Sequence, residues 1–371
     1  MTPAVDLVLD LGDIRITDSS RVGPKVARLG QLASAGWRVP DGYAVTAHAL
    51  ENWLPMAARS ELKRLFSDQA TGQVPDLAML GCTSAQAQAL IESQPLPPWL
   101  EDAVALAHER LQERTGRGSG LRVAVRSSAV GEDGAQASFA GQYATYLGIS
   151  GTADVLHHIR KCWASGYTTH AIEYRRRAGI DPPGSHELAV GILELVDARS
   201  AGVVFTLDPV TGDRNRLVIE ANWGFGESVV SGQVTPDHWI VDRASGNILD
   251  QTLGVKQMWS VFDSAAARVV LAPLPAELTV QASLEDREVR YLCKKAAEIE
   301  DAEGAPQDVE WAIARNIPFP DSVYILQHRP ETTWSARSPS SSPPTPAASR
   351  PGQAFDPVQY ALRNVFKVPS A

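Results

Sequence analysis

The sequence of 371 residues predicts a two-lobed α/β fold. Between Pro98 and Gly116 apolar residues recur at helical spacing, and from Leu121 to Arg126 apolar and polar residues alternate as they do in a strand. The Asp-Pro-Pro-Gly segment at 181–184 then breaks the chain, and the pattern beyond it is rich in strands. Regular elements of both kinds on each side of a break predict two mixed α/β lobes.

The first predicted lobe covers residues 1–184. Its helix at 98–116 follows prolines, ends before a glycine and presents one apolar face, formed by Leu100, Val104, Ala107 and Leu111. The strand after it ends at Arg126-Ser127-Ser128. Residues 130–148 are small, polar and glycine-containing and predict a loop, and one long helical pattern follows from 154 to about 177.

The second predicted lobe covers residues 185–334. Strand patterns occur at 187–196, 201–207, 217–221 and 238–241, and the last of these ends in a turn at 245–247. Helical spacing returns from 284 to 300. Two further strands, at 308–314 and 323–327, are joined by a turn that contains proline.

The C-terminal part is different in composition. Residues 335–354 are rich in Ser and Pro, cannot bury enough apolar surface to fold, and predict an extended linker. Residues 355–371 form a short apolar tail in which Val358, Leu362, Val365 and Phe366 would line one helical face. Such a helix either docks on a partner or packs back on its own domain, and both uses stay open.

Composition excludes several classes of protein. A formal net charge of -9 argues against a nucleic-acid binder, which needs clustered Lys and Arg. Cys82, Cys162 and Cys293 are odd in number and lack metal-ligand spacing, so they predict ordinary thiols in a reducing compartment. There is no secretory pattern at the start and no apolar run of about 18 to 20 residues, the length that spans a bilayer. We expect a cytoplasmic protein without a membrane partner.

Two cationic side chains lie beside glycine-containing segments. Lys25 follows Gly23, but a lone lysine near a glycine is usually a solvated surface residue. Arg126 is at the end of a predicted strand, where its planar fork suits bidentate contact with phosphate. The small residues that follow it let backbone N–H groups approach phosphate oxygens, as a lid over a triphosphate would.

These segments resemble the motifs of the phosphoenolpyruvate synthase and pyruvate phosphate dikinase family. Lys25, Arg126-Ser127-Ser128 and the segment Ser138-Phe139-Ala140-Gly141-Gln142 agree with the N-terminal, ATP-grasp domain of that family. Later motifs follow in the same order and spacing, at 201–206, 222–227, 234–237, 307–312 and 326–332. The resemblance covers residues 22 to 334, which makes chance agreement much less frequent than for one motif.

The resemblance implies a two-lobed ATP-grasp fold with a nucleotide cleft between the lobes, and ATP with Mg²⁺ as the bound cofactors. It gives catalytic roles on the ATP phosphates to Lys25, Arg126 and Arg329. The lid would be Ser138, Phe139, Ala140, Gly141 and Gln142, and the adenine would be met through the backbone of Glu194, Leu195 and Val196.

Glu310 and Gln327 would hold Mg²⁺, which prefers hard oxygen ligands and keeps waters and phosphate oxygens. Without the resemblance, Glu310 would be a paired strand carboxylate and Arg329 a structural salt bridge. The role of Asp308 is left open.

This sequence also departs from the family pattern. Leu193 and Leu195 replace a glutamine and a methionine, so an apolar slot for adenine is expected without side-chain reading of the base. In full-length relatives ATP phosphorylates a histidine on a separate swivelling domain. The segment most similar to a phosphohistidine motif, around His170, fits an ordinary helix. We therefore expect a separate phosphohistidine subunit and a hetero-oligomer.

The leading interpretation is the ATP-binding subunit of a split dikinase. It would phosphorylate a catalytic histidine on its partner, giving AMP and phosphate, for transfer to a small-molecule acceptor such as pyruvate or a phenolic compound. The organisation is similar to that of phenylphosphate synthase-type enzymes. Two alternatives are an ATP-binding fragment of a longer phosphoenolpyruvate synthase or antibiotic phosphotransferase, and a non-catalytic nucleotide sensor or scaffold.

Overall fold

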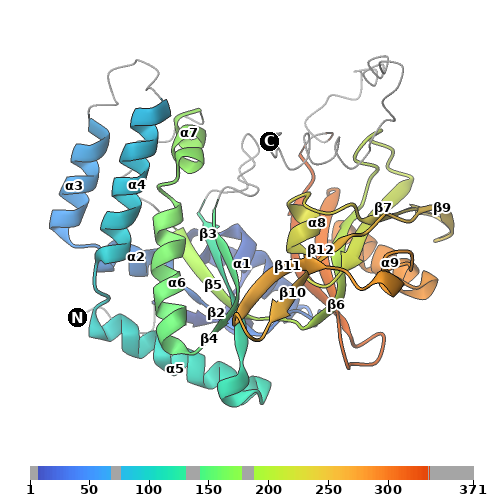
Figure 1. The fold of residues 1–371 in the computed structure, drawn as a ribbon, viewed down its shortest axis with the longest axis horizontal. Coiled ribbons are helices and arrows are strands. Elements are labelled where there is room, and N and C mark those ends of the chain that lie inside the picture. Colours follow the sequence, from blue (N-terminus) through green and yellow to red (C-terminus); the bar gives the residue numbers. More distant parts are fainter. Residues whose placement is uncertain (1–6, 68–76, 131–142, 178–187, 333, 335–371) are drawn as a thin grey trace. The chain divides into compact units, whose positions relative to one another are not determined.

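The computed structural model describes residues 7–67, 77–130, 143–177, 188–332 and 334. The chain divides into two compact units, Met1–Leu195 and Val196–Ala371, and each is described by itself. Their mixture of helices and antiparallel sheets confirms the predicted two-lobed α/β fold (Figure 1). The division falls after Leu195 rather than after residue 184, because the strand Leu188–Glu194 pairs with strands of the first unit on both sides.

The first unit is built on a five-stranded antiparallel sheet in the order β1-β2-β5-β3-β4. Its strands are β1 (Val8–Asp10), β2 (Gly42–Val45), β3 (Arg122–Ala129), β4 (Thr145–Ser150) and β5 (Leu188–Glu194). The predicted loop at 130–148 is wrong at its end, because β4 begins at Thr145. Its Thr, Tyr, Leu and Ile residues favour a strand, and they pair with β3 from Arg126–Thr145 to Arg122–Ser150.

Seven α-helices of the first unit are described: α1 (Ser19–Ser34), α2 (Ala47–Trp53), α3 (Met56–Ser67), α4 (Leu77–Ser93), α5 (Pro98–Thr115), α6 (Thr152–Ser165) and α7 (Thr169–Arg177). Short 3-10 turns lie at η2 (Leu11–Asp13), η3 (Ile16–Asp18) and η4 (Gly118–Gly120). Helix α5 has the predicted bounds. It ends at Gly116, which has φ 65°, a left-handed conformation that glycine adopts without strain.

The predicted continuous helix from 154 to 177 is wrong, because two helices separated at 166–168 occupy this stretch. The N–H groups of Gly166 and Tyr167 bond three residues back, as in a tight final turn. The Gly166 carbonyl accepts a hydrogen bond of 2.6 Å from the Arg175 guanidinium. The Arg175 guanidinium thus bonds to a carbonyl that would accept a backbone N–H in a continuous helix.

Apolar residues cover both faces of the first sheet. One face packs against α2, α5 and α6 and contributes Val123, Val125, Val190 and Ile192 to the larger core. The opposite face packs against α1 and contributes Ala44, Ala189 and Leu193. The alternation of side chains along β3 and β5 places these two sets on opposite sides of the sheet.

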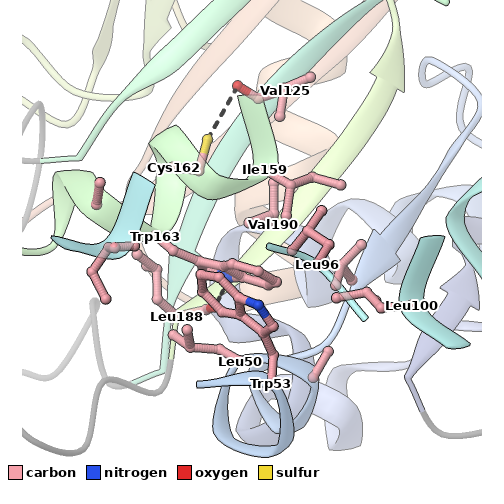
Figure 2. Packing of buried hydrophobic residues seen from close by; sticks show 14 of the residues in the cluster. Leu50, Trp53, Leu96, Leu100, Val125, Ile159, Cys162, Trp163, Leu188 and Val190 are labelled. Atoms are coloured by element: carbon pink, nitrogen blue, oxygen red, sulfur yellow. Dashed lines mark hydrogen bonds between the residues drawn. The ribbon is translucent and has the colours of Figure 1, made fainter. Parts of the chain in front are cut away.

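Two tryptophans form the centre of the larger core (Figure 2). The rings of Trp53 and Trp163 stack with 4.7 Å between their centroids, and the Trp163 indole N–H donates to the Leu188 carbonyl at 3.0 Å. The Cys162 thiol donates to the Val125 carbonyl at 3.7 Å. Burial raises the pKa of Cys162 to about 12, so this thiol stays protonated and serves packing.

The second unit is built on a six-stranded antiparallel sheet in the order β13-β12-β6-β7-β8-β9. Its strands are β6 (Ala198–Phe205), β7 (Arg216–Trp223), β8 (Asp237–Asp242), β9 (Ile248–Thr252), β12 (Gln307–Ala314) and β13 (Val323–Pro330); β10 (Met258–Asp263) and β11 (Arg268–Pro273) form a separate hairpin. Its helices are α8 (Glu227–Val230), the 3-10 turn η5 (Ala276–Leu278) and α9 (Asp286–Glu303). Neither the hairpin nor β9 is among the strands predicted from the sequence.

Helix α9 covers one face of the second sheet. On the opposite face Val203, Phe205 and Val218 are buried, with Val230 of α8 packed against them. None of the helices in the described part of the chain is long and apolar enough to cross a membrane.

A fully buried ion pair ties the segment after β9 to the start of β8. The Lys256 ammonium bonds to the Asp237 carboxylate, and neither side chain is exposed to solvent. The same carboxylate accepts from the Gly254 N–H and from both the N–H and the hydroxyl of Ser283. Such a pair is stable because its remaining hydrogen-bonding capacity is satisfied.

Candidate functional site

Lys25 is carried on α1, in a turn that packs tightly against the end of β3. Gly23 adopts φ 71° just before Pro24, and a Cβ at Gly23 would lie 2.2 Å from the Ser128 hydroxyl. The Val26 N–H donates to that hydroxyl at 3.5 Å. Only glycine fits in this close contact between α1 and β3. The Gly-Pro-Lys sequence therefore fixes the turn that holds Lys25 near the end of β3.

Arg126 lies on the sheet face that α1 covers. It pairs with Gly191 across β3 and β5, and a Cβ at Gly191 would come within 2.9 Å of Val26 of α1. Ser128 lies two residues further on and therefore on the same face. The structure thus places Arg126 on the face that packs the Lys25 helix, and both cationic residues are half-buried.

The segment expected to meet adenine, Glu194 to Val196, begins at the last residue of β5. The Glu194 N–H donates to the Asp41 carbonyl at 2.7 Å and the Leu195 N–H donates to the Arg122 carbonyl at 2.9 Å. Burial raises the pKa of Glu194, while its ion pair with Arg117, at 3.2 Å, opposes that shift.

Leu193 does not fit the expected apolar slot. It is buried in the smaller core of the first unit, against α1, whereas Leu195 is half-buried. Within a strand, two residues separated by one position share a face. Leu195 follows the end of β5, so this rule no longer places its side chain beside that of Leu193. The predicted lid, Ser138 to Gln142, lies outside the described residues.

In the second unit strand register places four predicted or candidate residues side by side. Glu310 of β12 is directly opposite Gln327 of β13, and Asp308 is directly opposite Arg329. Residues separated by two positions share a face, and so do directly opposed residues. All four side chains therefore project from the same face, and the Arg329 guanidinium donates to the Asp308 carboxylate at 3.1 Å.

Asp308, whose role the sequence left open, is buried. Burial raises the pKa of Asp308 to about 6; Arg329 opposes this shift, and Glu331 and Glu310 add to it. Its oxygen Oδ1, which does not bond to Arg329, is buried and has no hydrogen-bond partner in the described part of the chain. A buried carboxylate oxygen without a donor is suited to accept a cation or a water held by one. Its position two residues before Glu310 was the signal available in the sequence.

The donor set fits Mg²⁺. Asp308, Glu310 and Gln327 offer hard oxygen ligands on one face. Among the described residues there is no cluster of three or more His, Cys, Asp and Glu side chains arranged to enclose a metal ion. A site made of two carboxylates and an amide suits Mg²⁺, because this ion usually keeps waters and phosphate oxygens in its coordination sphere.

His170, the nearest sequence likeness to a phosphohistidine motif, is the second residue of α7 and is exposed. It lies in the first unit, whereas Asp308, Glu310, Gln327 and Arg329 lie in the second. It remains interpreted as a helix residue.

The comparisons with known proteins place the chain in a class of nucleotide-binding domains. A family model described as pyruvate phosphate dikinase, AMP/ATP-binding domain, matches residues 19–348, and the chain belongs to this family. The resemblance drawn from the sequence motifs is thereby confirmed.

Three similar curated proteins show how the domain is used. The chain is 38% identical to a probable phosphoenolpyruvate synthase of Staphylothermus marinus, over 88% of this chain and 41% of that protein. It is 33% identical to the phosphoenolpyruvate synthase of Aeropyrum pernix, over 89% and 43%. It is 36% identical to the prodigiosin synthesizing transferase PigC of Serratia marcescens, over 88% and 33%. The chain thus spans less than half the length of these relatives.

Proposed function

We propose that the chain binds Mg·ATP and phosphorylates a histidine on an acceptor protein segment, releasing AMP and phosphate. Cleavage of the α–β anhydride gives AMP, the β-phosphoryl group passes to the histidine, and water cleaves the β–γ anhydride. One observation carries this proposal. Two pairs of opposed residues on β12 and β13, Glu310 with Gln327 and Asp308 with Arg329, lie next to each other on one face of the sheet. They lie in a chain whose family is described as an AMP/ATP-binding domain.

Each unit offers a different part of the binding chemistry. In the first unit Lys25 and Arg126 would bind phosphate oxygens, where a fixed cation stabilises charge that develops during transfer. In the second unit Arg329 would meet the transferring phosphates. Its present partner, Asp308, holds the guanidinium in place at 3.1 Å.

Glu310, Gln327 and Asp308 would hold Mg²⁺ through oxygen atoms. Bound there with ATP, the ion would neutralise phosphate charge and polarise the phosphoryl oxygens. The orphaned Oδ1 of Asp308 supports this assignment, because an acceptor buried without a donor is costly unless a ligand completes it.

The base would be met by backbone groups of Glu194, Leu195 and Val196. Two of these three N–H groups are already bonded within the first unit, to Asp41 and Arg122. We therefore assign the hydrogen bond to adenine to the Val196 N–H and to carbonyl groups of the segment, with Leu195 as apolar contact.

The acceptor histidine lies either on a separate partner subunit or in the rest of a longer chain. The second arrangement is favoured by one observation, that the chain covers only 33% to 44% of the three relatives and of the Methanothermobacter protein that is also similar to it. Pyruvate, a phenolic compound and an antibiotic are all candidates for the final small-molecule acceptor.

The test is to incubate the purified chain with Mg²⁺ and ATP labelled on its β-phosphate, with and without an acceptor protein. The acceptor is a histidine-bearing polypeptide encoded beside this chain or the C-terminal part of the Staphylothermus marinus relative. We expect acid-labile label on the acceptor and an equal amount of AMP. If ATP binds but neither product forms with either acceptor, the chain is a nucleotide sensor or scaffold and the proposal fails.

A further inference from the structure

One arginine in the last turn of α5 joins this helix to β1 and to the residue that precedes β2. The Arg114 guanidinium donates to the Asp41 carboxylate through Nε at 2.9 Å and through Nη2 at 3.2 Å. Its remaining nitrogen, Nη1, donates to the carboxylate of Asp10, the last residue of β1, at 3.0 Å. The hydrogen bond to Asp41 is the first cause that raises the pKa of Arg114 above its usual value. Arg114 therefore holds Asp41 through a planar, two-point contact.

Asp41 in turn holds the start of the segment assigned to adenine. The pairing of β2 with β5 ends at Gly42 and Leu193, and just beyond it the Asp41 carbonyl accepts from the Glu194 N–H at 2.7 Å. Asp41 lies outside β2, so strand pairing does not by itself fix its position. Its carboxylate accepts from the Gly42 N–H at 2.6 Å and from Arg114. These bonds fix the carbonyl that Glu194 contacts.

The backbones of β2 and β5 approach closely at this point. A Cβ at Gly42 would overlap the Ile192 carbonyl, so only glycine allows the approach. No side chain of Gly42 separates the two strands. A displacement of Asp41 therefore acts directly on the backbone of Glu194, through one short hydrogen bond.

The chain that follows α5 also contacts this segment. Arg117 donates to the Glu194 carboxylate at 3.2 Å, and the Arg122 carbonyl, at the start of β3, accepts from the Leu195 N–H at 2.9 Å. The Arg117 side chain is 55% exposed and makes one bond, so its pair contributes little. Arg114 is 36% exposed and makes two bonds to one carboxylate. Of these two arginines, Arg114 provides the better defined connection.

We propose that Arg114 and Asp41 are positioning residues for recognition of the base, which hold the backbone at 194–195 where its carbonyl groups accept from the 6-amino group of adenine. The inference rests on the proposed function, in which this segment meets the base. Neither side chain has to touch the nucleotide. A hydrogen bond weakens steeply when its atoms lose alignment, so a segment held in place distinguishes a base with an amino group from one without it.

Loss of the pair should move the segment without unfolding the unit. The side chains of Arg114 and Asp41 are both more than a third exposed, and exposed pairs contribute little to the free energy of unfolding. Neither residue belongs to the two apolar cores of the first unit. Variants at both positions should therefore fold, and circular dichroism checks this.

Four variants test the inference. Arg114→Leu removes the guanidinium, and Arg114→Lys keeps the charge without the planar fork. Asp41→Asn removes the charge at the other end of the pair and leaves an oxygen for the Gly42 N–H. Arg64→Leu is the matched control, because Arg64 makes a similar two-point contact with Glu61, at 2.8 and 2.6 Å, within α3.

For each variant the Kd is measured by calorimetry with Mg·ATP and with the Mg complex of purine riboside triphosphate, which differs from ATP only in lacking the 6-amino group. We expect the wild type to bind Mg·ATP about fivefold more tightly, as one net hydrogen bond allows. Arg114→Leu and Asp41→Asn should weaken Mg·ATP about fivefold and the analogue less than about twofold, which removes the preference. Arg114→Lys should keep part of the preference, and Arg64→Leu all of it.

An unchanged preference for ATP in both Arg114→Leu and Asp41→Asn would overturn the inference. Equal losses of affinity for the two nucleotides would also overturn it, because the pair would then only support the fold of the unit. Equal binding of the two nucleotides by the wild type would do the same, because the amino group would not be recognised. Histidine phosphorylation does not enter this assay, so its failure is detected separately in the transfer experiment.

Discussion

In the first unit Lys25 and Arg126 reach one sheet face because a helix packs on a strand, whereas in the second unit four side chains share a face because of strand register. The first arrangement depends on a contact between residues 23 and 128, far apart in the sequence. The second depends on two strands joined by a short connection and on the alternation of side chains. The candidate residues of the first unit should therefore be sensitive to a single methyl group at the packing contact, and those of the second unit to loss of a functional group.

The largest expected effect is on transfer. Replacing Glu310 or Arg126 with Ala should lower the rate of histidine phosphorylation by about 10²–10³-fold, since Arg126 would contact the phosphates and Glu310 would hold the Mg²⁺ that neutralises them. The assay is label transfer from β-labelled ATP, with circular dichroism to confirm the fold. Glu298→Ala is a matched control, because Glu298 forms a surface pair with Lys295 on α9. Undiminished transfer in either variant would refute that residue's assignment.

The next effect is on stability and concerns the second unit. Lys256→Met leaves Asp237 buried without its cation, and we expect a loss of about 3–5 kcal/mol in the free energy of unfolding. Urea titration followed by tryptophan fluorescence measures it. Lys294→Met is the control, since Lys294 is largely exposed and its surface pair contributes little. Similar losses of free energy of unfolding in the two variants would show that the buried ion pair stabilises the protein no more than a surface pair does.

A smaller effect tests the packing contact of the first unit. Gly23→Ala places a Cβ against Ser128 at a positive φ, and we expect a loss of about 1–3 kcal/mol together with weaker Mg·ATP binding. Gly36→Ala is the control for backbone strain without a steric clash, because Gly36 has φ 82° and no atom within 4 Å of a Cβ. Equal behaviour of the two variants would show that the Ser128 contact does not position Lys25.

The smallest effect is a pH dependence caused by Asp308. Its pKa rises from 3.8 to about 6 on folding, so the native state binds more protons than the unfolded state between these values. The contribution of Asp308 to stability should therefore be greatest below about pH 4 and decrease as pH rises to about 6, by on the order of 2 kcal/mol. Wild type and Asp308→Asn are compared by urea unfolding without Mg²⁺. A difference between them that does not change with pH in this window would contradict the prediction.

Local patterns were sufficient where an element depends on its own residues. The spacing of Leu100 to Leu111 and the glycine after it predicted α5, alternation predicted β3, and two strand patterns joined by a proline-containing turn predicted β12 and β13. Prediction failed where a distant group intervened. Arg175 bonds to the Gly166 carbonyl at the break between α6 and α7, and pairing of β5 with β2 and β3 moved the boundary between the units.

The same distinction applies to the candidate site. The motifs named Lys25, Arg126, Glu310, Gln327 and Arg329, and their roles remain predictions. The environment of Asp308 was not accessible from the sequence, because its raised pKa comes first from burial, to which Glu331 and Glu310 add. The core position of Leu193 and the contact of Arg114 with Asp41 were likewise absent from any motif.

The sequence by itself determined the two α/β lobes, most of their strands, the chemical types of the candidate site residues and the family. These follow from periodicity, turn residues and motif order, all of which are local properties of the chain. Only the tertiary structure decided which side chains share a face, which are buried and what holds the segment assigned to adenine. Those outcomes depend on contacts between residues up to about a hundred positions apart, such as Gly23 with Ser128 and Asp41 with Arg114, and no local pattern encodes them.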